Sequence, residues 1–157
     1  MTRKTIVIIL LLAASLAGAY AQTVRLSLVY EGRGEYIQAF NEKFLDGAMA
    51  ALFDSGYIAT NDLPKPGDSL AFAAVKPSAD DREGFVELVL AVFTRFPPGD
   101  SPALPECSYR LMSVANGRVL AEGEVRSPAV APRTSAEFSQ ATAQLGELTV
   151  KASLRAF

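Results

Sequence analysis

The spacing of hydrophobic residues along the chain changes several times, and each spacing predicts a different element. From Thr23 to Tyr30, hydrophobic and polar residues alternate, which predicts a half-buried strand. From Glu35 to Ser55, hydrophobic residues recur at steps of three and four, which predicts a long helix with one buried stripe. The members of that stripe are Ile37, Phe40, Phe44, Ala48, Ala51 and Leu52. Gly56 follows where a helix commonly ends in a left-handed residue.

The segment after this helix carries turn residues and shorter patterns. We expect a short strand over 57–60, followed by a short helix that Asp68 or Ser69 caps. Residues 78–83 are expected to form one further helical turn, closed by Gly84.

The strongest strand pattern runs from Phe85 to Phe96 and is hydrophobic on both faces. One face carries Val86, Leu88, Leu90 and Val92, and the other carries Phe85, Val89, Ala91 and Phe93. Two hydrophobic faces are typical of a central strand, or of a strand with one face shared with a partner.

Two further strands, Cys107 to Ala115 and Arg118 to Val125, flank the dipeptide Asn116-Gly117, which favours a two-residue hairpin turn. This turn pairs Val114 with Val119 and Met112 with Ala121. The expected core face of the hairpin holds Met112, Ala121 and Val125.

The last helix is expected to begin at a capping box formed by Thr134 and Glu137 and to run to about Leu154. We expect Gly146 to weaken it slightly. Its predicted buried stripe is Phe138, Ala141, Leu145, Leu148 and Ala152. Together the elements predict an α+β fold, a two-layer sandwich with a mostly antiparallel sheet of about four strands and two long helices.

Residues 1–21 have the features of a secretory signal peptide. Arg3 and Lys4 give a basic start, a hydrophobic run follows, and Ala19-Tyr20-Ala21 supplies the small residues that signal peptidase accepts. The alternative is an uncleaved membrane anchor, for which the run is short against the roughly 20 residues that span a bilayer. We therefore expect a signal peptide over 1–21 and a single α+β domain over 22–157, periplasmic or secreted.

Composition excludes several kinds of chemistry. The 157 residues include no His, one Cys and no Trp. One chain alone therefore cannot form a Ser-His-Asp triad, a Cys-His pair, a His-ligated zinc or a Cys₄ metal site. The net charge is −2 and basic residues are scattered singly, so we expect no nucleic-acid binding. After residue 21 no hydrophobic stretch is long enough for a transmembrane helix.

Two local patterns are candidates for ligand binding, and each has an ordinary structural explanation. Gly32-Arg33-Gly34 lies between a strand and a helix, where phosphate loops occur, but the third glycine and a following Lys are missing, which favours a plain turn. Asp80, Asp81 and Glu83 lack the spacing of a calcium loop and suit the start of a helix. We predict no catalytic, cofactor-binding or metal-ligating residue.

Carboxylates and the single thiol leave other readings open. Glu87, Glu122 and Glu124 lie on predicted strands, and with Asp80 they are the candidates for carboxylate catalysis. Cys107 is expected to be a small buried residue, with an intermolecular disulfide or a nucleophile as alternatives. A Ser-Lys hydrolase has no Ser-x-x-Lys frame at any of Lys43, Lys65, Lys76 and Lys151.

The segment from Tyr109 to Ala121 resembles the strand-turn-strand of the CsgG/LpoB/TolB-N-terminal-like envelope domains. Gly117 and Val119 match the typical pattern of that family, whereas Ser113 and Asn116 stand where Asp and Thr are usual. The approach to the strand at 83–90 and the helix ending at Gly56 are similar to the family as well, and so is the order of elements. The resemblance implies a non-catalytic envelope domain that works through protein contacts, and it carries over no site residue.

We therefore expect an exported, non-enzymatic envelope domain that acts in protein–protein binding or assembly without a cofactor. Its partner is expected to be an envelope protein, with a homo-oligomer as one form of that contact. The predicted interaction surfaces are the sheet edges and the second face of the strand over 85–96. The alternatives are a small apolar-ligand carrier, which needs an enclosed pocket under the helices, and a carboxylate- or metal-dependent hydrolase.

Overall fold

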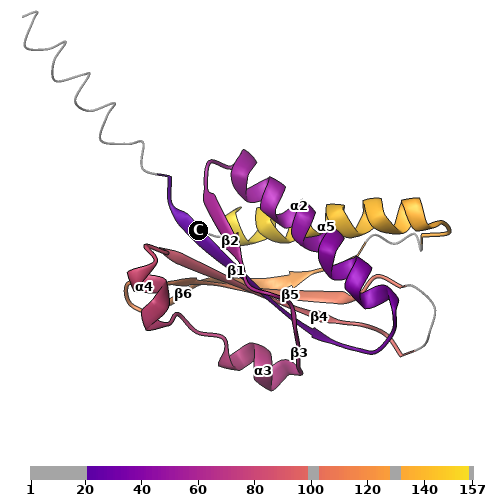
Figure 1. Ribbon diagram of the computed structural model, residues 1–157, viewed down its shortest axis with the longest axis horizontal. Helices are drawn as coiled ribbons and strands as arrows, with labels where there is room; N and C mark the ends of the chain where they lie inside the picture. The colour runs from indigo at the N-terminus through magenta and orange to yellow at the C-terminus, as the bar shows by residue number, and fades with distance from the viewer. Residues whose placement is uncertain (1–20, 99–102, 128–131, 156–157) are drawn as a thin grey trace, which may run out of the picture.

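One β-sheet with two long helices on one of its faces forms the body of the molecule (Figure 1). It is seen in a computed structural model, which describes residues 21–98, 103–127 and 132–155. The strands are β1 (Thr23–Glu31), β2 (Ile58–Asn61), β3 (Lys65–Pro66), β4 (Leu88–Arg95), β5 (Glu106–Ser113) and β6 (Val119–Val125). The helices are α2 (Tyr36–Asp54), α3 (Ser69–Ala74), α4 (Ala79–Glu83) and α5 (Ser135–Arg155).

The sheet has six strands and is mixed, which corrects the prediction of a mostly antiparallel sheet of four. Its order is β2-β1-β4-β5-β6, and β3 also pairs with β1. β1 runs parallel to β2, β3 and β4, while β5 runs antiparallel to both of its neighbours, β4 and β6. The parallel pairs arise because the chain leaves β1 through α2 and returns in the same direction, a crossover that needs a helix-sized connection.

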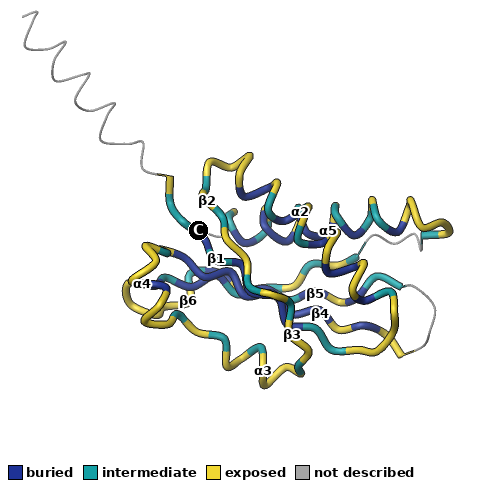
Figure 2. The backbone as a smooth tube through the Cα atoms, viewed as in Figure 1, coloured by how far each residue is buried: buried dark blue, intermediate teal, exposed yellow. Residues whose placement is uncertain are grey.

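The two long helices are confirmed, and they cover one face of the sheet. Every member of the predicted α2 stripe is buried. The ring of Phe40 stacks on Phe44, meets Phe96 edge-on at 4.9 Å between centroids, and lies 6.4 Å from Phe138 of α5. Aromatic side chains therefore pack between the helices and the sheet. Figure 2 shows that buried residues gather along the two long helices and the central strands.

Two glycines let α2 and α5 approach each other closely. A Cβ atom on Gly47 of α2 would lie 2.0 Å from the carbonyl oxygen of Ala143, and one on Gly146 of α5 would lie 2.2 Å from that of Phe44. Gly146, which was expected only to weaken its helix, is thus required for packing.

α5 begins after Thr134 as predicted, but only one of the two hydrogen bonds of the predicted capping box forms, and the buried face of the helix is shifted. The Thr134 hydroxyl accepts the Glu137 N–H at 3.1 Å, and the Glu137 carboxylate accepts the Arg133 N–H at 2.7 Å. Phe138 and Leu145 are buried, whereas the predicted core residue Leu148 is 39% exposed. The buried face instead passes through Gly146, where the backbone of α2 comes too close for a side chain. The buried residues include Thr142, Gly146, Thr149, Val150 and Ser153.

The hairpin has a different register from the one predicted. Met112 pairs with Val119 and Leu111 with Ala121, and a bulge lies between these two pairs. Only Gly117 adopts a positive φ, +69°, so the turn lacks the two left-handed residues of a type I′ hairpin. The bulge shifts the two strands by one residue, which places Ala121 on the helix-covered face and Met112 on the opposite face.

The predicted signal peptide lies outside the described residues, apart from Ala21. No helix in the described part of the chain combines the length and hydrophobicity that crossing a membrane requires.

Candidate functional site

The sheet face opposite α2 and α5, called the second face below, is covered over only part of its area. Val89 and Ala91 of β4, Met112 of β5 and Val114 just after β5 lie there. Phe72 of α3, Val75 and Val86 pack on them. The predicted central strand is confirmed as β4, which lies between β1 and β5 and is buried on both sides. Around this small core, the second face carries charged groups and an open groove.

An ion pair from β1 fastens α4 to the second face. The Arg25 guanidinium donates to both carboxylate oxygens of Asp81, from Nε at 2.5 Å and from Nη2 at 3.0 Å. It also bonds to Asp62 and reaches the carbonyl oxygen of Lys76 at 3.4 Å. The Asp81 carboxylate accepts the backbone N–H of Ser78 at 2.7 Å as part of a capping box that starts α4.

The charges of this ion pair stabilise each other. Burial alone raises the pKa of Asp81, but the hydrogen bonds from Arg25 and Ser78 outweigh burial and hold it below its ordinary value. Burial likewise acts to lower the pKa of Arg25, and the neighbouring carboxylates raise it overall. Asp81 is therefore committed to a structural contact. Together with Asp80 and Glu83 it does not form a cation site, and the described residues include no cluster of three Cys, Asp or Glu that could hold a metal ion.

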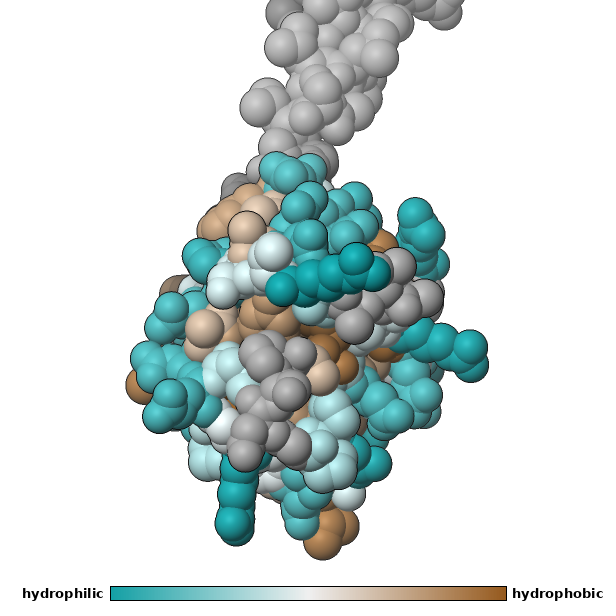
Figure 3. Space-filling view, turned by 90° about the vertical axis from the view of Figure 1, so that its right-hand side faces the viewer, coloured by the Kyte–Doolittle hydropathy of each residue, from teal (hydrophilic) through white to brown (hydrophobic). Residues whose placement is uncertain are grey.

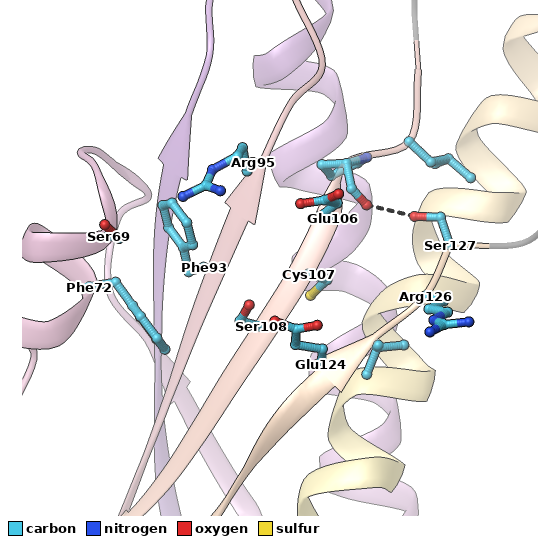
Figure 4. A pocket seen from close by; sticks show the side chains of 13 residues that line it. Ser69, Phe72, Phe93, Arg95, Glu106, Cys107, Ser108, Glu124, Arg126 and Ser127 are labelled. Carbon is cyan, nitrogen blue, oxygen red and sulfur yellow. Dashed lines mark hydrogen bonds between the residues drawn. The ribbon is translucent and has the colours of Figure 1, made fainter.

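An open groove of about 650 Å³ lies on the uncovered part of the second face, beyond α3 (Figure 4). Its aromatic wall is formed by Phe72 of α3 and Phe93 of β4, whose rings stack at 5.6 Å between centroids. Leu104 and Val125 add hydrophobic surface, and the Ser127 hydroxyl donates to the carbonyl oxygen of Pro105 at 2.6 Å along one rim. The strand ends beside this groove face the viewer in Figure 3, where hydrophobic surface shows between hydrophilic residues.

Charged residues line the groove beside its aromatic wall. The Arg95 guanidinium lies 5.5 Å from the centre of the Phe93 ring and pairs with Glu31 at 3.0 Å. Glu106 and Glu124 contribute two carboxylates. Arg126 also lines the groove and forms no ion pair with another described residue. This mixture of aromatic and ionic groups suits the contact of a protein surface.

Cys107 belongs to the core rather than to the groove chemistry. It is 1% exposed, and its sulfur lies 3.4 Å from the hydroxyl of Thr149 on α5. Burial raises the pKa of the thiol to about 12, and the contact with Thr149 lowers it only in part. The prediction of a small buried residue is confirmed, and such a thiol is neither a nucleophile nor accessible for an intermolecular disulfide.

The four candidate catalytic carboxylates fall in different places. Glu124 lines the groove, whereas Asp80 lines a separate cavity around Arg25. Glu122 forms an ion pair with Arg110 at 3.5 Å, and Glu87 is exposed just before β4. Sequence reasoning missed Glu106, which shares the groove with Glu124. Glu106 lies two residues before Ser108 on β5, and alternate residues of a strand face the same side. This spacing is the signal that could have placed Glu106 on the groove side of the strand.

The remaining candidates have structural surroundings. Gly32-Arg33-Gly34 forms the turn between β1 and α2, beside a cavity of about 740 Å³. Lys43 and Lys151 pair with Asp46 and Glu147 of their own helices. The other two lysines, Lys65 and Lys76, line the cavity around Arg25.

Both edges of the sheet carry features that oppose pairing with another strand. β6 is bulged and points Glu122 and Glu124 away from the core. At the other edge, Pro64 interrupts the chain between β2 and β3, and Pro66 lacks an N–H. Charges, bulges and prolines are common means of protecting sheet edges, so the second face is the better candidate surface.

Phe85 departs most from the expectation for its segment. It lies before β4 instead of on it, with φ +57° and 84% of its surface exposed. Its N–H bonds to the Arg82 carbonyl oxygen and the next N–H bonds to that of Asp81, so Phe85 holds the left-handed position of a Schellman motif that ends α4. Gly84, which suits that position, precedes it with an ordinary φ of −82°. A phenylalanine there adopts a backbone conformation that costs roughly 1–2 kcal/mol.

The sequence matches no protein-family model and no curated protein. Among solved structures, the fold is similar to that of PelC from Paraburkholderia phytofirmans, a dodecamer, with a TM-score of 0.52 and 17% identity over 85% of this chain and 89% of PelC. A neuraminyllactose-binding hemagglutinin homolog from Helicobacter pylori gives a TM-score of 0.50 at 10% identity, over 86% of this chain and 85% of that one. At such identities the likeness establishes the fold alone.

TolB from Acinetobacter baumannii is also similar, with a TM-score of 0.49 and 12% identity over 87% of this chain and 28% of TolB. The likeness to CsgG and LpoB stays a prediction.

Proposed function

We propose that this chain is a non-enzymatic domain of the cell envelope, periplasmic or secreted, that binds protein and assembles with further copies of itself. The observation that carries the proposal is the groove on the second face, where two stacked aromatic rings lie beside exposed charged groups. Aromatic residues and Arg are the types most enriched where proteins bind each other.

The protected sheet edges support the same function. Because β6 and the β2–β3 edge oppose strand addition, a partner is directed to the faces and loops of the domain. Large side chains are exposed there, including Leu63, Leu70 and Phe85. Scattered hydrophobic residues are ordinary on a surface, but a groove with an aromatic wall is a defined place for a contact.

The fold shared with PelC supports self-assembly as the form of the contact. PelC is a dodecamer, so a domain with this fold can assemble with many copies of itself. The carrier alternative has less support because aromatic side chains fill the region under the long helices, and the groove is open on the opposite face.

The test is the mass of the purified protein, measured by sedimentation velocity and mass photometry over a range of concentrations. Assembly into species larger than a monomer, and cross-linking of tagged copies in intact cells, are the expected results. A monomer at every concentration, with no cross-linked product, would overturn the proposal of self-assembly.

Two further measurements address the rest of the proposal. Cell fractionation and mass spectrometry of the exported protein test the periplasmic or secreted location and cleavage after Ala21. A hydrolytic activity that Glu106→Gln or Glu124→Gln abolishes, while the fold is retained, would favour the hydrolase instead.

A further inference from the structure

We propose that Phe85 is the residue through which one copy of this chain holds the next, by inserting its ring into the second-face groove of that copy. This inference rests on the proposed self-assembly and names its interface.

The conformation of Phe85 is the first reason. The residue holds a left-handed backbone position that disfavours any side chain, and 84% of its surface is exposed. The ring therefore contributes little packing to its own domain, while the backbone is strained. Strain without an internal benefit is typical of residues that act in binding. The Schellman hydrogen bonds hold the backbone, so the ring is presented from a fixed point.

The groove is suited to receive such a ring. Phe72 and Phe93 already stack at 5.6 Å, and an added ring can meet them in the offset or edge-on geometry that aromatic groups prefer. The cavity of about 650 Å³ has room for a phenyl group and the residues beside it. An aromatic anchor in a pocket is the usual centre of an interface.

The positions of the two features determine the kind of assembly. Phe85 lies three residues before Leu88, the first residue of β4, and the groove lies at the other end of β4, beside Phe93 and Arg95. A contact between opposite ends of the same strand is head-to-tail, so every copy offers one ring and one groove. Head-to-tail contacts produce closed rings when the rotation between copies closes, and filaments when it does not.

Charges near both features permit this contact. Glu83 and Glu87 flank Phe85 at two residues on either side, next to Arg82. The groove carries Arg95 and Arg126 together with Glu106 and Glu124. Because Arg126 forms no ion pair with a described residue of its own chain, it is the cation that can pair with Glu83 or Glu87 of the incoming copy.

The experiment uses two variants that each disable one side of the contact. Phe85→Ala removes the ring and keeps the groove, whereas Ser108→Trp fills the groove and keeps the ring, because Ser108 lines it and is partly exposed. Sedimentation velocity should show each variant alone as a monomer. An equimolar mixture should form one-to-one dimers and nothing larger. The only contact that remains is the Phe85 ring of the Ser108→Trp variant in the groove of the Phe85→Ala variant.

The control is Phe53→Ala, which removes a ring that is 55% exposed on α2. It should assemble as the wild type does, and circular dichroism and thermal unfolding should show that all three variants fold.

Each other outcome overturns the inference in a distinguishable way. If the wild type assembles and Phe85→Ala assembles equally well, this interface is wrong while self-assembly stands. If the wild type is a monomer, self-assembly fails together with the interface. If cross-linking in cells shows a different protein whose capture depends on Phe85, the second copy is the wrong occupant.

Discussion

The guanidinium of Arg25 holds the carboxylate of Asp81 by two hydrogen bonds across 56 residues of sequence. The side chain of Asp81 is 3% exposed and that of Arg25 is 17% exposed, so water contributes little to solvating either charge. This pair fixes α4, and with it Phe85, against the first strand of the sheet.

Replacing Arg25 should destabilise the fold strongly. Arg25→Ala leaves the Asp81 carboxylate buried without its partner, and loss of one partner of a buried pair typically costs about 3 kcal/mol. Arg25→Lys should recover only part of this, because an ammonium group cannot reproduce the two-point contact. Urea unfolding measures the difference. Arg95→Ala is the matched control, since it breaks an exposed pair worth about 0.5 kcal/mol. Equal losses for Arg25→Ala and Arg95→Ala would contradict the structural role of Arg25.

The same pair should make the fold sensitive to acid. The pKa of Asp81 is lower in the folded state than the value of about 3.9 that an unfolded Asp has. The stabilisation is therefore fully present above that unfolded value and is lost as the pH falls through the lower folded value. The free energy of unfolding, measured by urea titration from pH 7 downward, should decrease below about pH 4. Asp81→Asn should be less stable at pH 7 and should lose less on acidification. If Asp81→Asn follows the wild-type curve below about pH 4, then carboxylates other than Asp81 cause most of the loss of stability in acid.

Local sequence rules predicted the helices well and the sheet poorly, for a physical reason. The α2 stripe, the cap at Asp68 and the left-handed Gly56 depend on residues a few positions apart, and all three are confirmed. The parallel partners of β1 depend on contacts between distant segments, which the alternation within one strand does not encode. The bulge between Leu111 and Met112 likewise reversed the predicted face of Met112.

The candidate site was predictable only in outline. The two hydrophobic faces of β4 indicated that the second face matters, and Phe93 indeed lines the groove. Arg25 fitted the polar face of the alternating strand over 23–30, and nothing local to it indicated Asp81 as a partner. Phe85 continued the strand pattern so well that its exposure could not be anticipated. It is the Schellman motif of α4 that removes it from the strand.

Adding a methyl group at Gly146 should destabilise the contact between α2 and α5. Alanine is a better helix former than glycine by about 0.8–1 kcal/mol, so helix propensity alone predicts a gain. The structure predicts the opposite, because the new Cβ would lie 2.2 Å from the Phe44 carbonyl oxygen, and overpacking of this kind typically costs about 1–3 kcal/mol. Thermal and urea unfolding of Gly146→Ala measure the sign. Gln144→Ala, on the exposed side of the same helix, should be nearly neutral. A stabilised Gly146→Ala would show that the helices are further apart than described.

Gly56 and Phe85 hold equivalent positions after α2 and α4, and this permits a paired test of the strain at Phe85. In each case the residue's own N–H and the next one bond back to the helix, and φ is positive at +85° and +57°. Glycine adopts this conformation freely, whereas other residues do so at a cost. Phe85→Gly should therefore raise the free energy of unfolding by about 1 kcal/mol, and Gly56→Ala should lower it by a similar amount.

Urea unfolding of both variants, with Phe85→Ala as a third, separates backbone from side chain. Phe85→Ala keeps the strained backbone and removes the ring, so its stability should stay close to that of the wild type, because the ring of a residue that is 84% exposed contributes little. Gly56→Ala meets no nearby atom, so its loss reports the backbone alone. If Phe85→Gly proves less stable than the wild type, the ring supports its own domain and the reason for assigning it to a partner disappears. If Phe85→Gly is more stable and yet does not assemble, folding and binding make opposite demands on this residue, as a strained binding residue requires.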